Sequence, residues 1–181
     1  MYADAQKVVV AQGVDPLSLD PQGSVSIPTM VVTSNIYDTL VSRDRDLKIT
    51  NRLATSYKNI SPTKWQFNLR KGVTFHNGEP FNAESVNFTW EKSSKSVQKG
   101  WFNTIDRIEI INEYALNIIT KNPDPILLAR LTLMFIVPPK YIKNVGDAKF
   151  NLNPIGTGPF KVVKWIKSDQ VIFERNENYW D

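Results

Sequence analysis

The sequence contains no cysteine and only one histidine, His76, among its 181 residues. Without cysteine, neither a disulfide nor a thiolate metal site can form. With a single histidine, a transition-metal site built wholly by this chain is an unfavourable hypothesis. No apolar run approaches the roughly 20 residues that a transmembrane helix needs. We therefore expect no metal site, no cofactor and no membrane span in this chain.

The chain also lacks the motifs of common enzymes. No serine or cysteine occupies a recognisable nucleophile elbow, and no glycine-rich loop leads into a phosphate-binding helix. The stretch Gly156-Thr157-Gly158 leads into a predicted strand, so it lacks the helix N-terminus that binds phosphate. His76 precedes Asn77-Gly78, a strong turn signal, which favours a turn or surface position over a catalytic one. The sequence therefore predicts a protein that is not an enzyme.

Neither sign of charge is in strong excess. The 22 basic and 18 acidic residues give a net charge of +4, without a block of like charges. This balance is typical of a solvated mixed-charge surface, and no nucleic-acid partner is expected. A hydrophobic content of 41% is sufficient for a sizeable core, so the chain is expected to fold.

Hydrophobic periodicity is clearest in the middle of the chain. Apolar and polar residues alternate over residues 65–69, which predicts a half-buried strand, and Val73 and Phe75 predict a second one. Asn77-Gly78 marks a turn. Asn82 then predicts the N-cap of a helix.

The rest of the chain predicts further short elements. Apolar β-branched runs, proline positions and turn residues set their limits. They are a buried strand at 7–11, a helix at 28–40, a hairpin of strands at 105–111 and 116–120, a helix opened by Asp124-Pro125, a short helix and loop near 140–150, and strands at 160–165 and 171–175.

The order of residues adds information that periodicity does not contain. The run "FNLRKGVTFHNGEPFNAESVNFTW" (67–90) resembles the signature region of the family 5 extracellular solute-binding proteins. These are the dipeptide-, oligopeptide- and nickel-binding components of ABC importers. Other landmarks of that family follow its order: "DPLSLDP" (15–21), "NIYDTLV" (35–41), "NPIGTGPFKVVKW" (153–165) and "ERNENYW" (174–180).

The resemblance implies a fold and a domain organisation. It implies a mixed α/β lobe of the type II periplasmic-binding-protein class, with a mixed sheet and flanking helices. A first lobe is interrupted by an inserted smaller domain, and the second lobe is absent from this chain. On that pattern we expect a first-lobe segment at 1–41, the inserted domain at 42–152 and a return to the first lobe at 153–181.

The resemblance also implies candidate ligand contacts. A tryptophan matching Trp101 faces the cleft in nickel-binding relatives, although Trp101 also fits a residue that caps the edge of a sheet. Met134 stands where those relatives place an arginine, so a charged clamp is lost and an apolar wall is favoured; Arg130, one turn earlier, is a possible substitute. Gly156, Thr157 and Gly158 lie near the interdomain cleft, as a turn or as a direct ligand contact. Tyr37 is a weaker candidate.

The implied function is capture of a peptide-like solute outside the cytoplasmic membrane and its delivery to the permease of an ABC importer. Nickel chelates, opines and oligosaccharides are alternative ligands within the family. A stand-alone β-rich binding module is an alternative outside it. The location implied is the periplasm or the outer face of the membrane, with the export leader not part of this chain. Apolar surface left by a missing lobe is expected to favour dimerisation or strand exchange.

Overall fold

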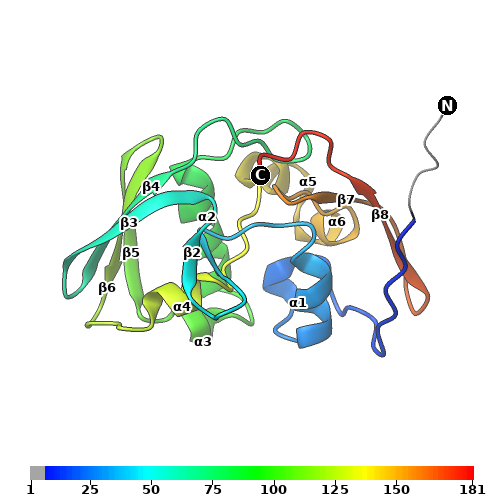
Figure 1. Cartoon of the computed structure of the whole chain (residues 1–181), viewed down its shortest axis with the longest axis horizontal. Coiled ribbons are helices and arrows are strands. Elements are labelled where there is room, and N and C mark those ends of the chain that lie inside the picture. Colours follow the sequence, from blue (N-terminus) through cyan, green and yellow to red (C-terminus); the bar gives the residue numbers. More distant parts are fainter. Residues whose placement is uncertain (1–6) are drawn as a thin grey trace.

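A computed structural model describes residues 7–181 of the chain (Figure 1). Short helices and antiparallel strands alternate along it, which confirms the mixed α/β class. The elements are η1 (Pro21–Gly23), α1 (Ile27–Thr33), β1 (Val41–Arg43), β2 (Ile49–Asn51), β3 (Ala54–Ser61), β4 (Lys64–Leu69), α2 (Ala83–Ser94), α3 (Lys99–Phe102), β5 (Ile105–Asn112), β6 (Ala115–Thr120), α4 (Leu127–Leu131), α5 (Pro139–Val145), α6 (Asp147–Leu152), β7 (Phe160–Ile166) and β8 (Gln170–Arg175).

The largest sheet has four antiparallel strands in the order β3-β4-β6-β5. Phe67 of β4 pairs with Leu116 of β6, and both side chains are buried. The helix α2 packs along β5. Its N-cap Asn82 accepts hydrogen bonds from the backbone of Glu84 and Ser85, and Ser85 completes a capping box.

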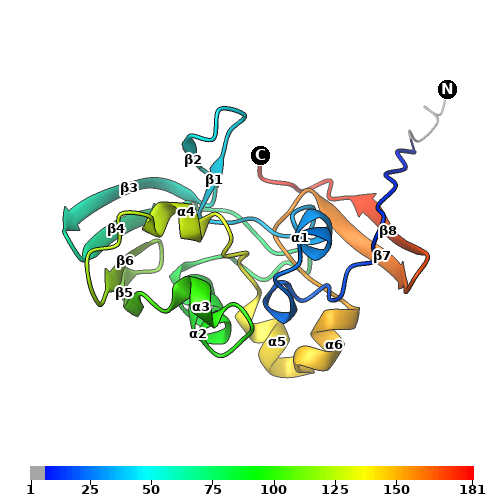
Figure 2. The ribbon, with the colours of Figure 1, turned by 90° about the horizontal axis from the view of Figure 1, so that it is seen from below.

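Two smaller sheets have two strands each, β1-β2 and β7-β8. The four-stranded sheet and the β7–β8 hairpin lie at opposite ends of the molecule in both ribbon views (Figures 1 and 2). The helix α1 and the α5–α6 pair lie on the side of the hairpin (Figure 2). The molecule therefore has a sheet-rich end and a second end built mainly from short helices and one hairpin.

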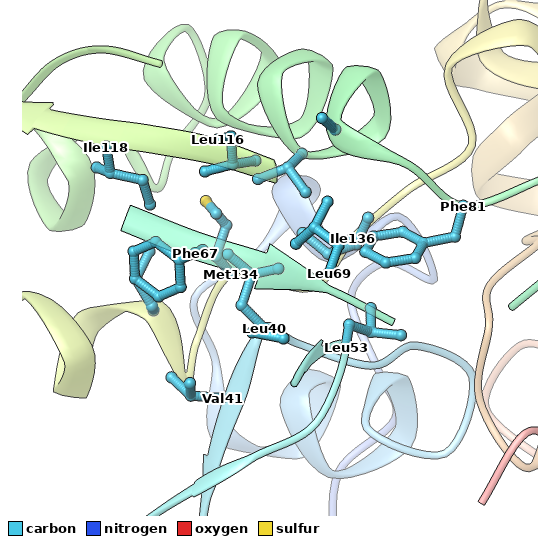
Figure 3. Packing of buried hydrophobic residues seen from close by; sticks show 14 of the residues in the cluster. Leu40, Val41, Leu53, Phe67, Leu69, Phe81, Leu116, Ile118, Met134 and Ile136 are labelled. Atoms are coloured by element: carbon cyan, nitrogen blue, oxygen red, sulfur yellow. The ribbon is translucent and has the colours of Figure 1, made fainter. Parts of the chain in front are cut away.

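Buried side chains form two cores that match these two ends. The first core comes from residues between Leu40 and Ile136 and includes the inner face of the large sheet (Figure 3). The second core joins residues from both sides of that span with Phe135 from within it: Leu19, Ile36, Tyr37, Phe135, Val137, Ile142 and Phe150. Residues 134–137 alternate between the two cores, because Met134 and Ile136 lie in the first while Phe135 and Val137 lie in the second.

Several sequence predictions are confirmed. The strand at 65–69 is β4, the helix capped by Asn82 is α2, and the hairpins at 105–120 and 160–175 form as expected. The segment near 140–150 forms α5 and α6, and the apolar run at 135–137 before it is buried without forming a strand.

Other predictions are wrong or only partly right. Residues 7–11 are neither a strand nor buried: Val8 is 82% exposed, because no strand within residues 7–181 pairs with the segment. The helix expected at 28–40 ends at Thr33, since Ile36 and Tyr37 instead turn inward to the second core. Val73 and Phe75 are buried as expected, but their hairpin contains only one isolated bridge, between Thr74 and Pro80.

Candidate ligand-binding site

Trp101 is the half-buried aromatic of the short helix α3. Its ring meets Phe102 edge-on, with the ring centroids 6.5 Å apart, and Phe102 is buried in the first core. The backbone N–H of Trp101 donates to the carbonyl of Gln98 at 2.8 Å. The indole therefore rests on the core on one side and retains accessible surface on the other.

The structure brings Arg130 to Trp101. Arg130 lies on α4, and its Nη1 donates to the backbone carbonyl of Trp101 at 3.0 Å. Its Nε lies 3.4 Å from Asp124 Oδ2. That contact is an ion pair without hydrogen-bond geometry, so Nε is a buried donor that lacks a hydrogen-bond partner among residues 7–181. The Arg130 side chain is 27% exposed, which leaves part of it accessible to a ligand.

Asp124 holds this cluster in place. Its carboxylate is almost buried and accepts a hydrogen bond from Thr104 Oγ1 at 2.7 Å and from the backbone of Ile126 at 3.1 Å. The prediction that Asp124-Pro125 opens this helix is wrong by two residues, because α4 begins at Leu127 and its N-cap is Ile126, without a side-chain cap bond. Asp124 instead holds the turn before α4 and forms the ion pair that fixes Arg130. An aromatic face beside a positioned guanidinium can contact an apolar side chain and bind a carbonyl or carboxylate group.

Met134 does not lie in this cluster. Its side chain is 0% exposed and belongs to the first core, where Figure 3 shows it beside Phe67 and Leu40. A ligand contact by Met134 would need a rearrangement of that core. Its suggested role as an apolar wall stays a prediction.

Tyr37 is also buried, at 1% exposed, and lies in the second core. Its hydroxyl donates to the carbonyl of Leu19 at 2.9 Å, and its ring meets those of Phe135 and Phe150. Burial, with a smaller contribution from the nearby charge of Asp20, raises the pKa of Tyr37 well above its usual range. In this structure Tyr37 is a packing residue whose hydrogen bond is already made.

The glycines of the 156–158 loop allow a close approach to the chain's own backbone. A Cβ on Gly156 would lie 1.9 Å from the carbonyl oxygen of Ile36, and a Cβ on Gly158 would lie 2.6 Å from the Ile36 carbonyl carbon. Neither glycine has a positive φ, so the need is for space rather than for an unusual dihedral. Gly158 N–H then donates to the Ile36 carbonyl at 2.8 Å.

Thr157 completes the loop by reaching a residue that the sequence did not single out. Its hydroxyl donates to Asp38 Oδ2 at 3.0 Å, and both residues are buried. Asp38 also accepts from Arg52 at 2.9 Å, from Trp180 Nε1 at 3.0 Å and from the hydroxyl of Tyr179 at 3.2 Å. A carboxylate inside the apolar motif "NIYDTLV" was the available signal.

Asp38 thus joins the early motif to the 156–158 loop and to the last motif of the chain. Two guanidinium groups lie over the ring of Trp180, with Arg52 at 5.0 Å and Arg70 at 4.5 Å from its centroid. Burial and the neighbouring Asp38 raise the pKa of Tyr179 above its usual range, so its hydroxyl remains a donor. We call Asp38, Arg52, Thr157, Tyr179 and Trp180 the Asp38 cluster; it is separate from the Trp101–Arg130 pair.

Apolar surface beside a small number of placed polar groups is what a small-ligand site requires, and Trp101 with Arg130 supplies both. Comparison with known families makes the class definite. The model described as "Bacterial extracellular solute-binding proteins, family 5 Middle" matches residues 48–181. The chain therefore belongs to the family 5 bacterial extracellular solute-binding proteins.

Individual relatives agree with this. The glutathione-binding protein GsiB of Pectobacterium atrosepticum is 29% identical over 97% of this chain and 35% of its own length. The ABC transporter-associated periplasmic binding protein DppA of Helicobacter pylori, in complex with the peptide STSA, is 29% identical with a TM-score of 0.83, covering 93% of this chain and 39% of DppA. NikZ of Campylobacter jejuni, in complex with Ni(L-His), is 28% identical with a TM-score of 0.82, covering 91% and 34%.

The chain thus spans little more than a third of the length of the relatives that it matches. Their fold confirms the expected lobe of a type II periplasmic binding protein. Within residues 7–181, no helix is both long and apolar enough to cross a membrane. Over the same residues, no group of three or more metal-ligating side chains comes together.

Proposed function

We propose that this chain is part of the substrate-binding component of an ABC importer, which captures a peptide-like solute and delivers it to a membrane permease. The observation that carries the proposal is the family match over residues 48–181. DppA of Helicobacter pylori, a structural relative at 29% identity, is described as ABC transporter-associated and periplasmic. By analogy, the protein acts outside the cytoplasmic membrane and binds its solute without turning it over.

A peptide is the proposed ligand because one relative holds the peptide STSA and because the site chemistry suits one. The Trp101 indole offers apolar surface, and the exposed part of Arg130 suits a peptide carbonyl or terminal carboxylate. A nickel chelate is the second candidate, favoured by the similarity to NikZ with Ni(L-His).

We propose Trp101 as the principal ligand contact of this chain, with Arg130 beside it. The burial of Tyr37, Met134 and Thr157, and the packing of Gly156 and Gly158 on Ile36, support a role for these residues in holding the lobe together. Direct contacts by them with a ligand stay a prediction.

The domain division is likewise a proposal. Segments 1–41, 42–152 and 153–181 follow the expected pattern of a first lobe with an inserted domain. The two cores support one refinement: α5 and α6 contribute Ile142 and Phe150 to the second core, which favours a return to the first lobe near residue 137.

Native mass spectrometry of the full-length gene product, purified from its own host, tests the proposal. We expect adducts of peptide mass that are removed by denaturation. An adduct with the mass of a nickel chelate would make the chelate, rather than a peptide, the favoured ligand. A protein without any adduct that also fails to bind a peptide library would overturn the proposal.

Calorimetric titration of the full-length protein with the peptide so identified tests the site. Trp101→Ala is expected to weaken binding about tenfold, the equivalent of about 1.4 kcal/mol. Ile111→Ala, on the exposed surface of β5, is the matched control and should bind as the parent does. Equal affinities for the parent and Trp101→Ala would remove Trp101 from the site.

A further inference from the structure

His76, the only histidine, contacts the 156–158 loop through its backbone N–H and through both of its ring nitrogens. Its backbone N–H donates to the carbonyl of Gly156 at 2.9 Å. The backbone N–H of Gly156 lies 3.3 Å from Nδ1, and Nε2 lies 2.9 Å from the carbonyl oxygen of Gly158. The position next to Asn77-Gly78 is a turn, as the sequence predicts, but the side chain is directed to a segment 80 residues away in the chain.

These contacts define the protonation state of the ring. The Gly156 N–H can only donate, so Nδ1 must be an unprotonated acceptor. The Gly158 carbonyl can only accept, so Nε2 must carry the proton. The neutral Nε2–H tautomer is therefore the form of His76 that satisfies both contacts.

The loop that His76 holds lies between the two cores. Phe75, the residue before His76, is buried in the first core. The loop residue Gly158 donates to Ile36, which is buried in the second core. His76 thus links the turn at the edge of the first core to a loop that packs on the second.

We propose that His76 is a pH-sensitive clasp: the neutral ring holds the 156–158 loop to the 75–78 turn at both Gly156 and Gly158, and the protonated ring loses its contact with Gly156, which loosens the attachment. A proton added to Nδ1 would face the N–H of Gly156, so that two donors would point at each other. The contact between Nε2 and Gly158 would survive, and the ring would move away from Gly156. This clasp is independent of the ligand and goes beyond the proposed function.

The surroundings of His76 favour the neutral ring. Burial is the largest cause of its lowered pKa; the bond to Gly158 acts in the opposite direction, Lys161 of β7 lowers the pKa further, and Asp38 raises it. Asp38 is engaged by Arg52 and Thr157. Glu79, across the turn, accepts from the backbone of Lys140 and Tyr141 at the start of α5.

The direction of the pH effect follows from the lowered pKa. Above pH about 6.5, the ordinary histidine pKa, neither the folded nor the unfolded state is protonated at His76, and the clasp contributes fully. As the pH falls below that value, the unfolded state binds a proton before the folded state does. The folding equilibrium constant therefore decreases by up to about tenfold per pH unit until the pH passes the pKa of the folded state.

The test follows the clasp in the 181-residue chain by NMR and by denaturant unfolding from pH 7.5 to 5. Long-range proton–nitrogen correlations should show the Nε2–H tautomer at pH 7.5 and a titration midpoint below that of a free histidine. Exchange of the Gly156 and Gly158 amides, corrected for intrinsic rates, should increase as the ring titrates. An Nδ1–H tautomer, or a midpoint at or above the ordinary value, would overturn the proposal without any variant.

His76→Gln is the matched variant, because a Gln side chain offers a donor and an acceptor without titrating in this range. Subtracting its stability profile from that of the parent removes the contribution of the carboxylates. We expect the difference to decrease as the pH falls below about 6.5. Identical pH profiles for parent and variant would rule the clasp out; should the variant not fold, the NMR measurement on the parent decides alone.

Discussion

The two ends of the molecule differ in how completely they bury their own apolar side chains. The first core has a four-stranded sheet, with α2 packed along β5, and lies within one continuous span of the chain. The second core is smaller and is assembled from separate segments beside a two-stranded hairpin. Large apolar side chains stay exposed at that end: Val8, Val9, Val10, Val14, Leu17, Val25, Ile27, Val31, Leu152, Phe160, Val163 and Ile172.

This difference shows where the stability of each end originates. Independent stability of a sheet requires three or more strands with an apolar face, or packing against a helix, whereas an isolated two-stranded hairpin is marginal. The second end therefore depends on contacts across the boundary between the cores. They include the Asp38 cluster, the 156–158 loop and the ion pair of Lys92 on α2 with Asp20, at 3.0 Å. We infer that the first core can fold without the second, but not the reverse.

The most direct test of this one-way dependence is a substitution that creates a cavity in each core in turn. Phe67→Ala removes a fully buried ring from the central strand β4 and should cost about 3–5 kcal/mol. Because the second end depends on the first, amide exchange should increase in both β4 and β7. Phe150→Ala, also fully buried, should increase exchange in β7 and leave β4 protected. Equal loss in both strands from Phe150→Ala would mean that the two cores form one cooperative unit.

The Asp38 cluster is expected to give the next largest effect. Asp38→Asn keeps the size of the side chain but replaces one acceptor oxygen with an NH2 donor. In one orientation of the amide this donor faces Trp180 and Thr157, and in the other it faces Arg52. Breaking a buried pair costs about 3–5 kcal/mol, and we expect about 3 because Arg52 is partly exposed. Denaturant unfolding measures the loss.

Asp106→Asn is the control for that variant, since its pair with Arg107 is exposed and its loss should change the stability far less. A loss from Asp38→Asn no larger than that of the control would show that the cluster does not stabilise the boundary.

Gly156→Ala tests, at a single position, how closely the 156–158 loop packs on the second core. The added Cβ would lie 1.9 Å from the Ile36 carbonyl oxygen, so the loop must move away from the second core. We expect a loss of about 1–3 kcal/mol. Gly100→Ala adds the same atom on α3, where nothing lies within 4 Å, and should be neutral or slightly stabilising. Similar effects from the two variants on thermal unfolding would contradict a close-packed loop.

Patterns that depend on neighbouring residues were predictable from the sequence. The strand at 65–69 and the Asn82 cap are local, because alternation and capping are decided within a few residues. Motif order also identified the family, which periodicity cannot do.

Contacts between distant segments were not predictable in the same way. Nothing near His76 or Asp38 in the sequence indicates that both reach the 156–158 loop, 80 or more residues away. The position of Arg130 against Trp101 likewise depends on where α3 and α4 pack, although the family resemblance had named Arg130 as a substitute for the arginine that Met134 replaces.

The segment at 7–11 is where the pattern and the structure disagree most, and it gives the prediction with the smallest effect in this chain. A run of β-branched residues favours a buried strand, but it does not show whether a neighbouring strand is present to pair with it. Replacing Val8, Val9 and Val10 together by Ser should change the unfolding free energy by less than about 0.5 kcal/mol here, because all three are exposed. In the longer protein proposed above, the same triple substitution should cost several times as much, since a pairing strand would bury these side chains. Denaturant unfolding of both chains measures the difference. An equal, small effect in both chains would mean that Val8, Val9 and Val10 stay exposed in the longer protein as well, and that the apolar run serves some other contact.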